Sequence, residues 1–83
     1  MERIALSGVL HIEEQGFGFL HSSDTLPGEW RGIYVSASLI QRFRLNVGDR
    51  VAGWGRPLRA GEQNYGLRRI EAINGKAVAV KGN

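Results

Sequence analysis

The sequence predicts an all-β fold, a barrel of five strands with a short helical turn between the third and fourth strands. Short apolar alternations recur along the chain, and turn signals separate them. The 12 glycines are typical of tight turns and bent strands rather than long helices. A chain of 83 residues has the length of one domain, so we expect residues 1–83 to form a single unit.

The first half of the chain predicts a hairpin followed by a long loop. Apolar alternation indicates two strands, and Ser7-Gly8 within the first is typical of a bend or a bulge. The loop is indicated by Asp24, Pro27 and two glycines. In order, we expect a strand over 4–12, a hairpin loop over 13–16, a strand over 17–22 and a loop over 23–32.

The second half predicts one helical segment and the remaining strands. Ser36 is a suitable N-cap, and the apolar residues that follow it have helical spacing. Asn74-Gly75 is typical of a type I′ turn, which predicts a hairpin near the end of the chain. In order, we expect a strand over 33–35, a helical segment over 36–43, a turn over 46–49, strands over 50–59 and 64–73, and a short sixth strand over 76–80.

Five strands with a helical turn after the third is the order of an OB-fold. OB-folds present their second and third strands, with the adjoining loops, to oligonucleotides or oligosaccharides. A small SH3-like barrel is the alternative architecture with a similar number of strands.

Composition and charge exclude several classes of protein. The formal net charge is +3, and the 11 basic residues are arginines except for Lys76 and Lys81. The arginine guanidinium binds phosphate and stacks on bases, so an anionic partner is compatible with this composition. There is no Cys, which excludes disulfides and Cys-bearing zinc sites and fits an intracellular, cytoplasmic location. No apolar run approaches the roughly 18 residues of a membrane span, and we expect no membrane partner, metal or cofactor.

The most informative segment is Gly16-Phe17-Gly18-Phe19-Leu20-His21. Side chains alternate between the two faces of a strand, so Phe17, Phe19 and His21 share one face and Leu20 lies on the other. With Leu20 in the core, the two phenylalanines are exposed as platforms on which bases stack. The alternative register places both phenylalanines in the core and Leu20 outside.

Three further aromatic or acidic residues each have a functional and a structural interpretation. Tyr34 takes the face opposite Ile33 and Val35, as a third exposed ring or as an ordinary half-buried residue. Glu62 is an acceptor for the exocyclic amino group of cytosine or a solvated loop charge. Trp54 is interpreted as a partly buried barrel residue, with a stacking surface or a subunit contact as alternatives.

Taken together, these segments resemble the RNA-binding domain of the bacterial transcription termination factor Rho. The match is collinear and covers roughly residues 8–74. Its motifs are Gly8-Val9-Leu10, Gly16-Phe17-Gly18-Phe19-Leu20, Ile33-Tyr34-Val35-Ser36, Arg42-Phe43, Leu45, Gly48-Asp49, Arg56-Pro57, Gly61-Glu62 and Leu67.

The resemblance implies a cold-shock-like OB barrel that binds single-stranded, pyrimidine-rich RNA with a preference for cytosine. It implies that the family's stacking, reading and basic contact residues fall on Phe17, Phe19, Tyr34, Glu62 and Arg69. The chain departs from the family's usual residues inside the expected site, at His21, Gly32 and Asn64, the last followed directly by Tyr65. The full set of expected RNA-binding residues is Phe17, Phe19, His21, Tyr34, Glu62, Asn64, Tyr65 and Arg69.

Three functional hypotheses follow. The first is the primary RNA-binding domain of a Rho-like termination factor, with RNA, single-stranded DNA, the rest of a Rho chain or a Rho hexamer as possible partners. The second is a free-standing cold-shock-like RNA chaperone, and the third is a protein-interaction barrel with the rings as a docking patch. An enzyme is not expected, because His11 and His21 have no evident nucleophile and the phosphate-loop motif of an ATPase is absent.

Overall fold

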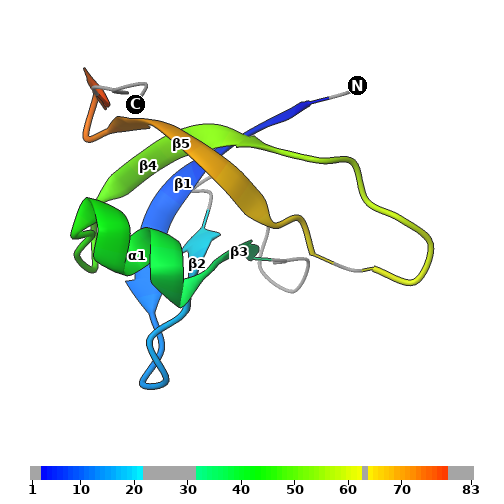
Figure 1. Cartoon of the computed structure of the whole chain (residues 1–83), viewed down its shortest axis with the longest axis horizontal. Helices are drawn as coiled ribbons and strands as arrows, with labels where there is room; N and C mark the ends of the chain where they lie inside the picture. Colours follow the sequence, from blue (N-terminus) through cyan, green and yellow to red (C-terminus); the bar gives the residue numbers. More distant parts are fainter. Residues whose placement is uncertain (1–2, 22–31, 63, 79–83) are drawn as a thin grey trace.

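The structure, a computed structural model, describes residues 3–21, 32–62 and 64–78, which form one antiparallel sheet and one helix (Figure 1). The sheet has the strand order β3-β2-β1-β4-β5-β6. Its strands are β1 (Ile4–Ile12), β2 (Gly18–His21), β3 (Ile33–Val35), β4 (Arg50–Gly55), β5 (Leu67–Ile73) and β6 (Lys76–Ala77). The helix α1 (Ala37–Phe43) lies between β3 and β4 in the chain, as predicted.

The long strand β1 is shared by both halves of the sheet. Its residues from Ile4 to Val9 pair with β4, and those from Val9 to Ile12 pair with β2. Both registers are unbroken, so Ser7-Gly8 does not form a bulge, which was one of the two predicted alternatives. Gly8 is needed for a different reason, because a Cβ there would lie 2.7 Å from the carbonyl oxygen of His21. The register shifts occur instead between β4 and β5.

The two ends of the sheet approach each other without forming a continuous ladder. A single parallel bridge joins Tyr34 to Gly66, and the Tyr34 N–H donates to the carbonyl of Tyr65 at 2.8 Å. The six-stranded sheet is therefore not closed, and the predicted all-β, OB-like fold with a helix between the third and fourth strands is confirmed. Because β3 has only three residues, it offers little edge for a longer ladder with β5.

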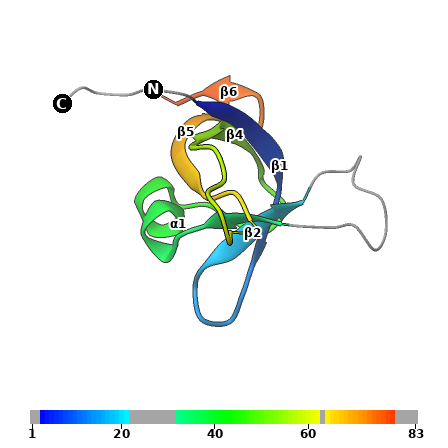
Figure 2. The ribbon, with the colours of Figure 1, turned by 90° about the vertical axis from the view of Figure 1, so that its right-hand side faces the viewer.

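The core lies inside the curved sheet, and α1 covers one side of it (Figure 2). Ile40 is the residue of α1 that enters this core. The buried side chains are Leu6, Leu10, Leu20, Val35, Ile40, Leu45, Val51, Leu67 and Ile70. Within the described residues, no helix is long and apolar enough to cross a membrane.

Local signals explain where the helix and the last hairpin form. The Ser36 hydroxyl accepts a hydrogen bond from the Leu39 N–H at 3.2 Å, which confirms Ser36 as the N-cap. Asn74 and Gly75 both have positive φ, 52° and 84°, as a type I′ turn requires. The turn over 46–49 is also confirmed, because the Asp49 N–H donates to the carbonyl of Asn46.

Three strands are shorter than predicted. The strand β2 begins at Gly18 rather than Phe17, β4 ends at Gly55 rather than Arg59, and β5 begins at Leu67 rather than Asn64. Pro57 has no N–H to donate to a ladder, and an ion pair between Arg56 and Glu62 holds this segment as a loop. The predicted end of the second strand at residue 22, most of the predicted loop (23–31) and the predicted end of the sixth strand (79–80) lie outside the described residues.

Candidate nucleic-acid interface

Side chains of β2 alternate between the core and the outer face as the sequence predicts. Leu20 is 1% exposed and Gly18 is buried, whereas Phe17, Phe19 and His21 are only half-buried. The alternative register, with both phenylalanines in the core, is therefore wrong. Tyr34 on β3 is 42% exposed and is the partner of Phe19 across the two strands.

Phe17, Phe19 and Tyr34 form one cluster, which we name the aromatic surface. The ring centroid of Phe17 lies 5.8 Å from that of Phe19 and 5.8 Å from that of Tyr34. The centroids of Phe19 and Tyr34 are 6.0 Å apart. The two phenylalanines meet edge to face at 85°, an arrangement that aromatic pairs favour. These contacts order the rings while part of each remains accessible.

Two glycines set the path of the chain that carries these rings. Gly16 has a φ of 107°, which turns the hairpin just before Phe17. Gly18 lies so close to β1 that a Cβ would collide with the carbonyl oxygen of His11. The Gly-Phe-Gly-Phe pattern therefore combines a turn, a close strand contact and two outward rings in four residues.

His11 extends the row of outer-face side chains onto β1. It is the cross-strand partner of Phe19, and its ring lies 5.9 Å from that of His21 in an edge-to-face arrangement. Its Nε2 lies 3.5 Å from a carboxylate oxygen of Glu13. The sequence favoured a surface or stacking role for His11 over a catalytic one but did not place it among the expected RNA-binding residues, a position that the register of the β1–β2 hairpin identifies.

Glu62 is held by Arg56 through two hydrogen bonds. Arg56 Nη1 donates to Glu62 Oε1 at 2.9 Å, and Nη2 donates to Oε2 at 2.6 Å. The backbone N–H of Arg59 donates to Oε1 at 2.8 Å. The hydrogen bonds from Arg56, and then the one from Arg59, lower the pKa of Glu62 to about 2, and the same pair raises the pKa of Arg56. Glu62 is therefore a fixed, ionised acceptor.

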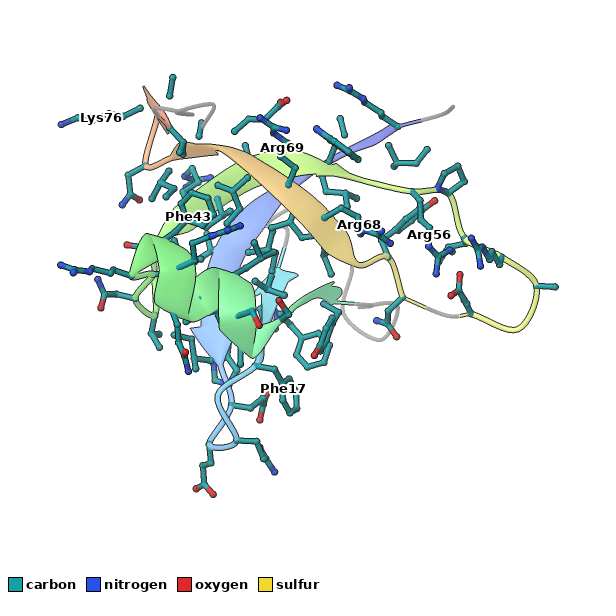
Figure 3. All side chains as sticks on the ribbon, viewed as in Figure 1. Phe17, Phe43, Arg56, Arg68, Arg69 and Lys76 are labelled. Carbon is teal, nitrogen blue, oxygen red and sulfur yellow. The ribbon has the colours of Figure 1, made fainter. Side chains whose placement is uncertain are left out.

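The Glu62 carboxylate keeps capacity for another donor. An ionised carboxylate offers about four acceptor positions, and the described N–H groups occupy three of them. The loop that contains Arg56 and Glu62 projects from the molecule on a different side from the hairpin that contains Phe17 (Figure 3). The described contacts therefore do not bring Glu62 against the aromatic surface, and Glu62 is an exposed loop charge that is paired with Arg56.

Asn64 and Tyr65 lie where β5 approaches β3. Asn64 Nδ2 donates to the carbonyl oxygen of Gly32 at 2.6 Å. The departures at Gly32 and Asn64 are thus in direct contact and tie the β4–β5 loop to the start of β3. Tyr65 is half-buried against the core, and its backbone carbonyl receives the Tyr34 N–H. Both residues support the position of Tyr34.

Arg69 is not adjacent to the aromatic surface. It is exposed on β5, and Figure 3 shows it at the opposite end of the molecule from Phe17. Trp54 on β4 is half-buried and faces away from the buried Gly53 and Gly55, as predicted. Trp30 lies outside the described residues.

Partly exposed rings on an open sheet, a paired carboxylate and scattered arginines are groups that can bind a strand of unpaired bases. Rings accept stacked bases, carboxylates accept amino groups, and guanidinium groups contact phosphates. Across the described parts of the chain, no group of three or more His, Asp or Glu side chains is arranged to hold a metal ion.

Comparison with known proteins identifies what the chain is similar to. A family model described as Rho termination factor, RNA-binding domain, matches residues 6–79. The transcription termination factor Rho of Bacillus subtilis is 46% identical over 71 residues, which are 84% of this chain and 16% of that protein. The Rho factors of Pseudomonas aeruginosa and Salmonella typhimurium are 45% and 44% identical over 75 residues, 88% of this chain and 18% of each protein. The chain spans less than a fifth of the length of these relatives.

Proposed function

Because the chain belongs to the family of the RNA-binding domain of Rho termination factor, we propose that it binds single-stranded, cytosine-rich RNA across the outer faces of β2 and β3. The observation that carries this proposal is the aromatic surface, in which Phe17, Phe19 and Tyr34 contact one another on the outer face of the sheet. Stacking on such rings is worth roughly 1–3 kcal/mol per base and tolerates any base.

Base selection requires a group that hydrogen-bonds a base edge. We assign this role to Glu62, because its carboxylate is ionised, held rigidly by Arg56 and able to accept one more donor. The amino group of cytosine is such a donor, whereas uracil presents a carbonyl oxygen at the same position and would be repelled. RNA that is stacked on the rings reaches Glu62 by crossing the segment of Asn64 and Tyr65.

The wider role that we propose for this chain is drawn from the proteins that contain a domain of this family. The segment matches the RNA-binding domain and contains no phosphate-loop motif. We therefore propose no catalytic role for this chain. We propose that it captures a transcript in the cytoplasm for the rest of a Rho chain or for a Rho hexamer. All of residues 1–83 would then act as one binding unit.

Fluorescence anisotropy of labelled oligo-cytidine and oligo-adenosine RNA, titrated with the protein at moderate salt, tests this function. A clear preference for oligo-cytidine supports the Rho-type site. Equal binding to both favours a general cold-shock-like chaperone, since stacking alone does not distinguish bases. Binding to neither RNA would reject the nucleic-acid function and favour a protein-interaction barrel.

A further inference from the structure

Trp54 holds an arginine on the surface formed by β1, β4 and β5. The guanidinium carbon of Arg3 lies 4.6 Å from the centroid of the Trp54 ring, a cation–π contact. Ala5 is the cross-strand partner of Trp54 on β1, and its small side chain leaves room for the ring. A guanidinium that rests its face on a ring keeps its in-plane N–H donors free for another ligand.

A second arginine lies opposite Trp54 on the neighbouring strand, β5. Arg69 is the cross-strand partner of Trp54 on β5, and such partners have Cβ atoms about 4.5–5.5 Å apart on one face. A register shift lies directly beside this pair. Ion pairs described in the structure involve neither Arg3 nor Arg69. Glu71, exposed two residues further along β5, is the nearest acidic residue along that strand.

This group of side chains is separate from the aromatic surface. Arg69 and Phe17 lie at opposite ends of the molecule in Figure 3, and the described ring contacts of the aromatic surface do not include Arg69. The basic contact that the family resemblance assigns to Arg69 is therefore not placed beside a nucleotide stacked on Phe17. It requires a different part of the RNA strand.

We infer that Arg3, oriented by Trp54, and Arg69 form a second site that binds phosphodiester groups of a longer RNA strand. This inference rests on the proposed function and extends it. Guanidinium groups bind phosphate through paired N–H donors, and two of them on one surface can contact two phosphates of the same strand. Single-strand sites on OB-folds range over roughly 4–16 nucleotides, so a short oligonucleotide fills the aromatic surface and a long one reaches the second site.

The test compares a 4-nucleotide and a 16-nucleotide oligo-cytidine over a series of salt concentrations. The variants are Arg3→Gln, Arg69→Gln and the double substitution, with Lys76→Gln as a matched control that removes one exposed cation from β6. Each phosphate contact on a single strand contributes roughly 0.7 to the slope of log affinity against log salt. We expect the double variant to lose about 1.4 of the slope for the long RNA and none for the short RNA.

Two results would overturn the inference. The first is an unchanged slope for the long RNA in the double variant, and the second is an equal loss per charge in Lys76→Gln. Either result leaves the proposed function intact as long as both oligonucleotides bind the unmodified protein. Failure of the short RNA to bind the unmodified protein would reject the proposed function itself.

Trp54 is a positioning residue in this account, and its replacements separate that role from folding. Trp54→Phe keeps a ring beneath Arg3 and should retain the slope for the long RNA. Trp54→Leu removes the ring face and should lower the slope of log affinity against log salt for the long RNA by about 0.7. Thermal denaturation checks that this variant is folded. In a Trp30→Phe background, the 16-nucleotide RNA should change Trp54 fluorescence and the 4-nucleotide RNA should not. Loss of slope in both Trp54 variants, or no fluorescence change, would contradict the role.

Discussion

Phe19 and Tyr34 are cross-strand partners on β2 and β3, with ring centroids 6.0 Å apart and ring planes at 73°. The residue after Phe19, Leu20, is 1% exposed and belongs to the core. Adjacent positions on one strand therefore have different functions. One position presents a ring to solvent, and the next holds the sheet together.

Removing the ring of Phe19 should weaken RNA binding without unfolding the protein. Because one stacked base is worth roughly 1–3 kcal/mol, Phe19→Ala should reduce affinity for oligo-cytidine about 5- to 150-fold. Anisotropy titration measures this loss, and circular dichroism monitors the fold. An unchanged affinity would mean that bases do not stack on this ring.

Shortening Leu20 should destabilise the protein and leave RNA binding by the folded molecules nearly unchanged. Leu20→Ala leaves a cavity in the core and should reduce the free energy of unfolding by about 2–5 kcal/mol. Urea denaturation measures this change. RNA affinity per folded molecule should stay close to that of the unmodified protein, because the side chain faces away from the aromatic surface. A variant that is as stable as the original would place Leu20 outside the core.

The division between Phe19 and Leu20 could be predicted because strand alternation is local and strict. The helix cap at Ser36 and the turn at Asn74-Gly75 were predicted for the same reason, since each depends on residues close together in the chain. The absence of a bulge at Ser7-Gly8 could not be predicted. Gly8 is required by a contact with His21, and that contact exists only once β1 and β2 pair.

The site was predicted less completely than the fold because its charged groups are fixed by distant contacts. Sequence alone did not reveal that Arg56 holds Glu62, or that Asn64 contacts Gly32. The resemblance placed Arg69 in the site, and Figure 3 shows it at the opposite end of the molecule from Phe17.

Replacing Arg56 should change the ionisation of Glu62. In the unmodified protein the pKa of Glu62 is about 2, below the ordinary value of 4.5. The carboxylate therefore stabilises the fold above about pH 4.5, and this contribution is lost as the pH falls towards 2. In Arg56→Gln the pKa should rise towards 4.5, which an NMR titration of the Glu62 side-chain carbon measures.

The Arg56→Gln result has a functional counterpart. If Glu62 reads cytosine only when Arg56 holds it, the variant should lose part of its preference for oligo-cytidine over oligo-uridine and keep most of its stacking affinity. Lys76→Gln removes a distant charge and serves as the control. A Glu62 pKa that stays near 2 in Arg56→Gln would show that another group determines it.

Adding a methyl group at Gly53 should destabilise the sheet. A Cβ there would collide with the backbone carbonyl oxygen of Arg69, which cannot rotate away. We expect Gly53→Ala to lower the free energy of unfolding by roughly 1–3 kcal/mol, the usual cost of overpacking. Gly66→Ala is the control, because a Cβ there meets no atom within 4 Å. Equal stability of the two variants would contradict the β4–β5 register.

The central claim is that RNA lies on the outer faces of β2 and β3, and an NMR titration of the protein with a 4-nucleotide oligo-cytidine tests it most directly. We predict that the largest changes in chemical shift occur at Phe17, Phe19 and Tyr34, with smaller changes at His11 and His21. Changes centred on α1 or β6, with the three rings unaffected, would contradict the account.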